Sequence, residues 1–312
     1  MSVDLPEVTR VYENHHLDSR RWDVYKPRDS DVIITTSYKA GTTWTQQILY
    51  ELFYRSQEVK PDFEAVSPWP EARFIPITKH ELGLFMESIE GRRFIKSHLP
   101  LDGLPYYPEV KYLIIGRDCR DVFMSFFNHY SRYTDLAMEM MNNADRMGDP
   151  LKPCPEDPRE LWQDWISKGW FEWESEGFPF WANLGHTASY WPYRHLPNFM
   201  FLHYNDMLAD LKGSIEKICD FIGEKPTPEQ LKTIVESTTF ANVKAKVEAT
   251  DIESDQMALS FKGGSSGFFF KGTNNRWRDV LTEADLVLYE EAKSRVLSLD
   301  CARWLEEGGD VL

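Results

Sequence analysis

The chain has 312 residues, a length that suits one large α/β domain or two smaller ones. It carries 35 basic and 50 acidic residues, and the net charge of −15 argues against a nucleic-acid or anionic-membrane partner. The four cysteines are widely spaced without a C-x-x-C pair, which is typical of a reducing compartment and excludes an ordinary zinc site. The amino-terminal residues lack the pattern of a signal peptide, and no apolar stretch approaches the ~20 residues that span a bilayer. We therefore expect a cytoplasmic protein without an integral membrane segment.

Short apolar runs alternate with longer helical patterns along the chain, as in a parallel sheet built from βαβ units. The runs that predict strands are residues 32–35, 94–97, 112–115 and 199–202. The helices expected after them are about 43–55, a segment that carries Val122, Phe123, Phe126 and Phe127, and about 208–222. This alternation predicts an α/β fold in which a parallel β-sheet is flanked by helices.

Two segments depart from this alternation. Residues 134–158 are rich in Met, Asn, Asp and Pro, which predicts an irregular insertion or a lid. Residues 244–276 combine charges, a Gly-Gly-Ser-Ser-Gly run and aromatic residues, which predicts a long, mobile loop. No linker divides the chain, so we expect a single domain over residues 1–312.

The segment after the first predicted strand has the pattern of an anion site. A glycine-bearing loop, residues 37–41, leads into a predicted helix, and backbone N–H groups at a helix amino terminus bind phosphate well. A nucleotide triphosphatase loop would require lysine directly after Gly41, whereas the only lysine here is Lys39, two residues before it. Loop shape alone leaves three interpretations open: a P-loop kinase or NTPase, another nucleotide site, and a turn without a ligand.

Six segments, in order, resemble those of the cytosolic sulfotransferase family. The first loop shares Lys39, Gly41, Thr42, Thr43 and Trp44 with the family pattern Y-P-K-S-G-T-T-W. Residues 96–100, K-S-H-L-P, resemble K-T-H-L-P, and Arg117 precedes Ser125 by the family's eight residues. Residues 203–207 and 238–240 resemble F-Y-E-D-M and T-S-F. Residues 270–282 resemble R-K-G-x-x-G-D-W-K-N-x-F-T, with Lys271, Gly272, Trp277 and Thr282 matching.

The resemblance implies a P-loop-NTPase-like sulfotransferase fold and a transferase (EC 2.8.2.-). The co-substrate would be 3′-phosphoadenosine 5′-phosphosulfate (PAPS), the product 3′,5′-adenosine bisphosphate (PAP), and no metal would take part. His98 would be the base that deprotonates the acceptor hydroxyl, with Lys39, Lys96 and Ser125 as the other catalytic residues. The implied nucleotide-binding residues are Lys39, Ala40, Gly41, Thr42, Thr43, Trp44, Arg117, Ser125, Tyr204, Thr238, Phe240, Phe270, Lys271, Gly272 and Arg276.

The last segment departs from the family at three positions. Phe270 stands where the family has arginine, Asn275 replaces glycine and Arg276 replaces an acidic residue. We expect Arg276 to supply the positive charge that Phe270 removes from the 3′-phosphate site.

The resemblance leaves the acceptor and the assembly open. Aromatic residues at the family's acceptor positions favour a hydroxyl of a hydrophobic small molecule or of a glycolipid. The regions concerned are Pro68–Pro70, Phe74, Phe85, Trp162–Trp173 and Trp181–Trp191. The family's dimer motif would fall at Arg278–Val287, where only Thr282 fits, so we expect no dimer by that route. A P-loop kinase or NTPase, and a catalytically inactive nucleotide-binding relative, remain the alternatives.

Overall fold

The computed structural model describes residues 5–143, 149–248, 256–268 and 272–311. The strands are β1 (Val32–Thr36), β2 (Phe94–Ser97), β3 (Lys111–Gly116) and β4 (Phe199–His203). The α-helices are α1 (Thr42–Tyr54), α2 (Lys79–Ser88), α3 (Cys119–Tyr130), α4 (Asp135–Asn143), α5 (Pro158–Ser167), α6 (Leu184–Tyr190), α7 (Tyr204–Ala209), α8 (Leu211–Ile222), α9 (Pro228–Thr238), α10 (Phe240–Glu248), α11 (Gly264–Phe268), α12 (Glu283–Val296) and α13 (Leu299–Glu307). The 3₁₀ helices are η1 (Ser19–Val24), η2 (Glu64–Val66), η3 (Leu101–Gly103), η4 (Trp191–Tyr193), η5 (Gln256–Leu259) and η6 (Arg276–Asp279).

The four strands form one parallel sheet in the order β2-β1-β3-β4. The predicted strands and the α/β fold with a parallel, helix-flanked sheet are therefore confirmed. Because the strands are parallel, their carboxyl ends lie at one edge, and the segments that begin at Ser37, His98, Arg117 and Tyr204 all leave from it. That the whole chain is a single domain stays a prediction.

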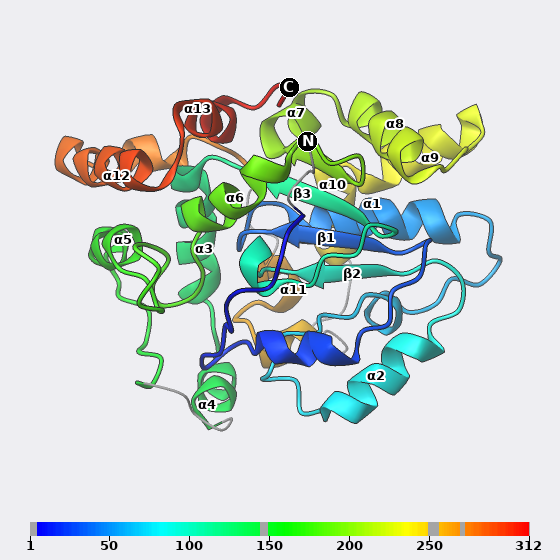
Figure 1. Cartoon of the computed structure of the whole chain (residues 1–312). Coiled ribbons are helices and arrows are strands. Elements are labelled where there is room, and N and C mark those ends of the chain that lie inside the picture. Colours follow the sequence, from blue (N-terminus) through cyan, green and yellow to red (C-terminus); the bar gives the residue numbers. More distant parts are fainter. Residues whose placement is uncertain (1–4, 144–148, 249–255, 269–271, 312) are drawn as a thin grey trace.

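Hydrophobic side chains alternate between the two faces of the sheet. Ile33 and Ile114 belong to one buried cluster, which includes residues of α3, α5 and α6, whereas Ile34 and Leu113 belong to another, formed with α1, α8 and α9. Figure 1 shows α1, α8 and α9 gathered on one side and α5, α6 and α12 on the other. Each strand is thus covered on both faces, as its continuous apolar sequence predicts.

Capping residues in the sequence set several helix ends. Thr78 with Glu81, Thr227 with Gln230, and Thr282 with Asp285 form capping boxes at the starts of α2, α9 and α12. The helix predicted at about 208–222 is wrong as a single element, because it is two helices separated at Asp210. The Asp210 side chain accepts a hydrogen bond from the N–H of Gly213 and so starts α8.

The two segments predicted to be irregular contain more helix than expected. Within 134–158 the chain forms α4 and the first residue of α5, and residues 144–148 lie outside the described ranges. The expected long loop at 244–276 holds the end of α10, η5, α11 and the first residue of η6. Packing of Phe261 and Phe268 against His129 of α3 gives this region a folded partner that sequence patterns do not reveal.

The four cysteines are free, and no helix among the described residues is long and apolar enough to cross a membrane.

A buried ion pair fixes the start of β1. Asp31 and Arg93, whose side chains are both fully buried, pair at 2.5 Å, and Asp31 also accepts a hydrogen bond from the hydroxyl of Tyr25. Arg93 further donates to the carbonyl oxygens of Lys26 and Met86. Removing one member of a buried, hydrogen-bonded pair leaves an uncompensated charge in the interior.

We predict that Asp31→Ala lowers the free energy of unfolding by about 3–5 kcal/mol, measured by urea denaturation, because Arg93 loses its buried partner. Lys168→Ala, which breaks an exposed pair with Asp164, is the control and should leave stability nearly unchanged. Equal stability of Asp31→Ala and the parent protein would contradict this account.

Candidate functional site

The loop between β1 and α1 forms the centre of the candidate site. Gly41 has φ 122° and is the N-cap of α1, so it provides no side chain to cap the first-turn N–H groups. A Cβ atom at this position would lie 3.1 Å from the ring of Tyr204, which gives a second reason for glycine. Beside the loop, the hydroxyls of Thr36 and Thr42 lie 2.5 Å apart. The loop therefore presents a helix amino terminus, with its partial positive charge, toward the carboxyl edge of the sheet.

His98, directly after β2, is buried and held in one orientation. Its ring Nδ1 lies 2.9 Å from the carbonyl oxygen of Thr36, so Nδ1–H donates and the lone pair is on Nε2. Its backbone N–H donates to Glu71, whose other oxygen accepts from Trp22. Burial, reinforced by nearby Lys96, lowers the pKa of His98 well below its usual value. A neutral, oriented imidazole of this kind can accept a proton from a hydroxyl group.

Two partly buried lysines lie near this histidine. The ammonium of Lys39 is 3.3 Å from Nδ1 of His129 and 4.0 Å from the ring centroid of Phe268. The ammonium of Lys96 is 3.9 Å from the ring centroid of Trp69. Burial lowers the pKa of Lys39 to about 7 and that of Lys96 to about 8. An anion placed between them would raise both pKa values again and be bound by charge-assisted hydrogen bonds.

Arg117 joins three parts of the chain at the end of β3. Its guanidinium donates to the carbonyl oxygen of Lys39 at 3.1 Å and to the side-chain oxygen of Asn274 at 2.7 and 3.2 Å. It also stacks over the ring of Tyr204, with 4.0 Å to the centroid. Arg117 is 4% exposed, and burial lowers its pKa. The planar guanidinium group of Arg117 can bind phosphate while it also holds the loop between β1 and α1.

The predicted adenine-binding residues come together on the far side of the loop. The rings of Trp44 and Tyr204 make an edge contact at 5.4 Å, and the indole N–H of Trp44 donates to the carbonyl oxygen of Thr238 at 2.7 Å. Gly272 has φ 64°, and a Cβ there would lie 2.6 Å from the ring of Phe240. The hydroxyl of Tyr204 lies 3.4 Å from the carbonyl oxygen of Gly272. These residues come from α1, α7, α9, α10 and the segment after residue 271.

The remaining predicted residues are less fully placed. Arg276 lies in η6, where burial and the charge of Arg117 lower its pKa, so the two guanidinium groups are neighbours. Ser125 is half-buried on α3, the helix that also carries His129, the histidine contacted by the ammonium of Lys39. Ala40 and Thr43 lie in the loop and the first turn of α1. Phe270 and Lys271 lie outside the described residues.

Sequence patterns missed several residues that support the site. The side chain of Asn274 accepts hydrogen bonds from the guanidinium of Arg117. Asp121 accepts a hydrogen bond from the backbone N–H of Asn275 at 2.6 Å, and burial raises the pKa of Asp121 to about 6. His129 contacts Lys39, and Glu71 holds the backbone of His98. Asn274 lies within residues 270–282, which resemble a family segment, but it is not one of the matching positions. Its role is visible only from its hydrogen bonds with Arg117.

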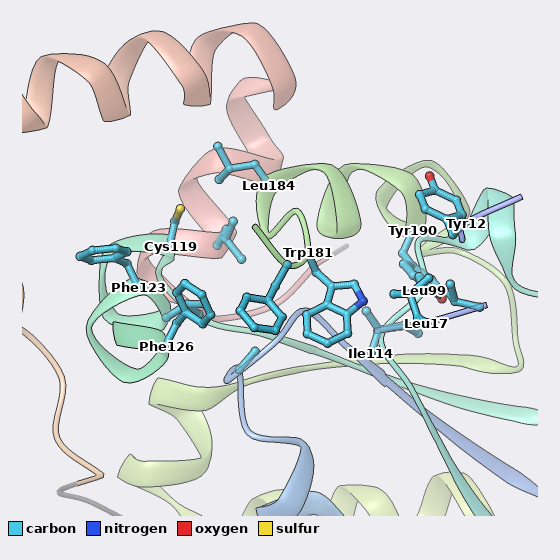
Figure 2. Close-up of a cluster of buried hydrophobic side chains, with 14 of the residues drawn as sticks. Tyr12, Leu17, Leu99, Ile114, Cys119, Phe123, Phe126, Trp181, Leu184 and Tyr190 are labelled. Atoms are coloured by element: carbon cyan, nitrogen blue, oxygen red, sulfur yellow. Dashed lines mark hydrogen bonds between the residues drawn. The ribbon is translucent and has the colours of Figure 1, made fainter. Parts of the chain in front are cut away.

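The aromatic residues proposed to line an acceptor pocket divide into two groups. Trp69 and Trp181 lie with ring centroids 5.2 and 5.5 Å from that of His98. Figure 2 shows Trp181 within a large buried cluster that also contains Phe126. In contrast, Trp162 and Trp165 pack on Phe123, and Trp191 packs on Trp304. These three residues fill the core between helices, and a role of their segments in lining an acceptor pocket stays a prediction.

Comparisons with known proteins agree with this arrangement. Residues 29–297 match the family model for the sulfotransferase domain. The chain is 28% identical to a glycolipid sulfotransferase of Mycobacterium bovis, over 99% of this chain and 98% of that protein. It is 27% identical to sulfotransferase 2A1 of Macaca fascicularis, over 86% and 85% of the two chains.

Solved structures share the fold. A retinol dehydratase in complex with androsterone and the inactive cofactor PAP has a TM-score of 0.68 at 22% identity, covering 91% of this chain and 87% of that one. Mouse sulfotransferase SULT7A1 complexed with PAP has a TM-score of 0.65 at 19% identity, covering 91% and 89%. With a family model that spans most of its length, the chain belongs to the sulfotransferase domain family.

Proposed function

We propose that the protein transfers a sulfuryl group from PAPS to a hydroxyl of a hydrophobic small molecule or a glycolipid. The observation that carries the proposal is a neutral, oriented His98 beside two partly buried lysines and the loop that ends at Gly41. A base, cations and a helix amino terminus are the groups that in-line transfer from a phosphosulfate requires. Glycolipid sulfotransferases among the relatives support the glycolipid alternative.

In the proposed reaction, the acceptor oxygen attacks sulfur as its proton passes to Nε2 of His98. The bond between sulfur and the bridging oxygen of the 5′-phosphate breaks, and PAP leaves. Lys39 stabilises the bridging oxygen and Lys96 the sulfuryl oxygens, so fixed cations take the role that a metal ion has in phosphoryl transfer from nucleotide triphosphates. Metal independence is part of this proposal.

The nucleotide would lie across the loop with its 3′-phosphate at Arg117, Ser125 and Arg276. The adenine would lie among Trp44 and Phe240, whose aromatic faces can stack on a purine. Arg276, next to Arg117, supports the idea that it compensates for Phe270. The family resemblance assigns Ser125, on α3 eight residues after Arg117, to the 3′-phosphate.

We predict that His98→Ala lowers kcat at least about 100-fold, because the base is lost, while the affinity for PAP changes less than about twofold. Turnover of radiolabelled PAPS with a naphthol acceptor and calorimetric titration with PAP measure the two effects. Near-normal turnover by His98→Ala would show that another group is the base.

We predict that PAP raises the melting temperature of the protein more than ATP with Mg²⁺ does at equal concentration, because the cations fit a 3′-phosphate. Arg117→Ala should weaken PAP binding about 10- to 100-fold, since it removes charge-assisted hydrogen bonds. Lys168→Ala, at an exposed position, is the control. A larger shift with ATP and Mg²⁺ would favour the kinase or NTPase alternative.

We predict that PAP binding takes up protons at about pH 8. In the unliganded protein the pKa of Lys39 is about 7 and that of Lys96 about 8, so both are partly neutral there. The anion favours their charged forms and raises both pKa values, so affinity should fall as the pH rises from about 7 to about 9. Titration calorimetry in buffers of different ionisation enthalpy measures the uptake, which Lys39→Met should reduce. An uptake of zero in the parent protein would refute the assignment.

A further inference from the structure

His16, in the segment before η1, is a buried histidine that the proposed reaction does not use. Its side chain is 3% exposed, and its ring centroid lies 4.6 Å from those of both Trp181 and Phe74. Neither Nδ1 nor Nε2 forms a hydrogen bond with any residue in the described part of the chain. Buried polar groups are nearly always hydrogen-bonded, so two unpaired nitrogens on one ring require an explanation.

His16 packs against the same aromatic rings as His98. The ring of Trp181 lies 4.6 Å from His16 and 5.5 Å from His98. For Trp69 the two distances are 5.6 and 5.2 Å, and for Tyr38 they are 6.5 and 5.3 Å. Three aromatic rings therefore contact both histidines, and these rings with the two imidazoles form what we call the aromatic box.

The chemistry of the aromatic box indicates what it can hold. Burial lowers the pKa of His16 well below its usual value, so the ring is neutral, with one nitrogen as donor and the other as acceptor. A hydroxyl group can satisfy either nitrogen, because it both donates and accepts. The indole N–H of Trp181 also has no hydrogen-bond partner among the described residues. The ring faces, in turn, suit the apolar C–H face of a small cyclic molecule.

We propose that His16 binds a second hydroxyl of the acceptor, so that the site selects a polyhydroxylated compound, such as a pyranoside, over a simple alcohol. The inference rests on the sulfuryl transfer proposed above. His98 deprotonates the reacting hydroxyl, and His16 holds another hydroxyl of the same molecule across the aromatic box. His16 is thus a specificity-determining residue that does not contact the reacting hydroxyl, whereas His98 does.

The test compares octyl β-glucoside, below its micelle-forming concentration, with n-octanol, which has the same chain and a single hydroxyl. In the parent protein kcat/KM should be higher for the glucoside. His16→Phe keeps an aromatic ring and removes both nitrogens, so it should lower kcat/KM for the glucoside at least about tenfold and that for n-octanol less than about twofold. His16→Gln, which keeps a donor and an acceptor, should recover part of the loss.

His15→Phe is the matched control. His15 is equally buried and its nitrogens are also unpaired within the described residues, but its ring contacts are Trp170, Phe180 and His16 rather than the rings around His98. The His15→Phe variant should leave the ratio of kcat/KM for octyl β-glucoside to kcat/KM for n-octanol unchanged. A normal thermal shift with PAP shows that each variant is folded, and a further shift on adding octyl β-glucoside to the PAP complex reports acceptor binding without turnover.

The outcomes separate this inference from the proposed function. Equal losses on both acceptors in His16→Phe, loss on neither, or a parent protein that prefers n-octanol would overturn the inference alone. So would sulfation of a naphthol without any turnover of the glucoside. A parent protein that neither binds PAP nor sulfates any hydroxyl would overturn the proposed function itself.

Discussion

The burial of Lys39, Lys96 and Arg117 at the carboxyl edge of the sheet is the constraint on which the site depends. Burial lowers the pKa of all three side chains, because charge is less stable away from water. The two lysine ammonium groups lie against the rings of Phe268 and Trp69, and Arg117 lies over Tyr204. An anionic nucleotide would relieve this cost, so the same arrangement that is costly by itself would favour binding of the proposed donor. It also explains how a protein with a net charge of −15 can hold an anion.

The parallel sheet makes this concentration of charge possible. Register pairs Ser97 with Thr35 and His203 with Gly116, so the ends of neighbouring strands lie at the same level. A residue directly after each strand then reaches one shared edge without a long loop. Arg117 stabilises this arrangement, because its hydrogen bonds to Lys39 and Asn274 hold the β1–α1 loop against the segment after residue 271.

The acceptor side follows a different principle, because it is built from aromatic rings instead of charges. Tyr38, Trp69 and Trp181 surround His98 closely and exclude water from the base, which lowers its pKa and keeps it neutral. Among these rings, the two nitrogens of His16 and the indole N–H of Trp181 are polar groups without a hydrogen-bond partner in the described residues. Under the two proposals made above, donor recognition depends on fixed positive charge, whereas acceptor selection depends on shape and on a few polar atoms within the rings.

The sequence by itself determined the four strands and the glycine-bearing turn before α1, because both depend on local patterns of apolar residues and glycine. The grouping of Trp44 with Phe240 was implied by the family resemblance, and their role in binding adenine stays a proposal. The sequence could not determine the break at Asp210, the helices within 244–276 or the core positions of Trp162 and Trp165, since these depend on packing between distant segments. Nor could it show that Asn274 holds Arg117 or that His16 faces the rings around His98. The hydrogen bond between Arg117 and Asn274 joins residues 157 positions apart, and the ring contacts of His16 join separate segments as well. Such contacts form only when the chain folds, so no local pattern of residues predicts them.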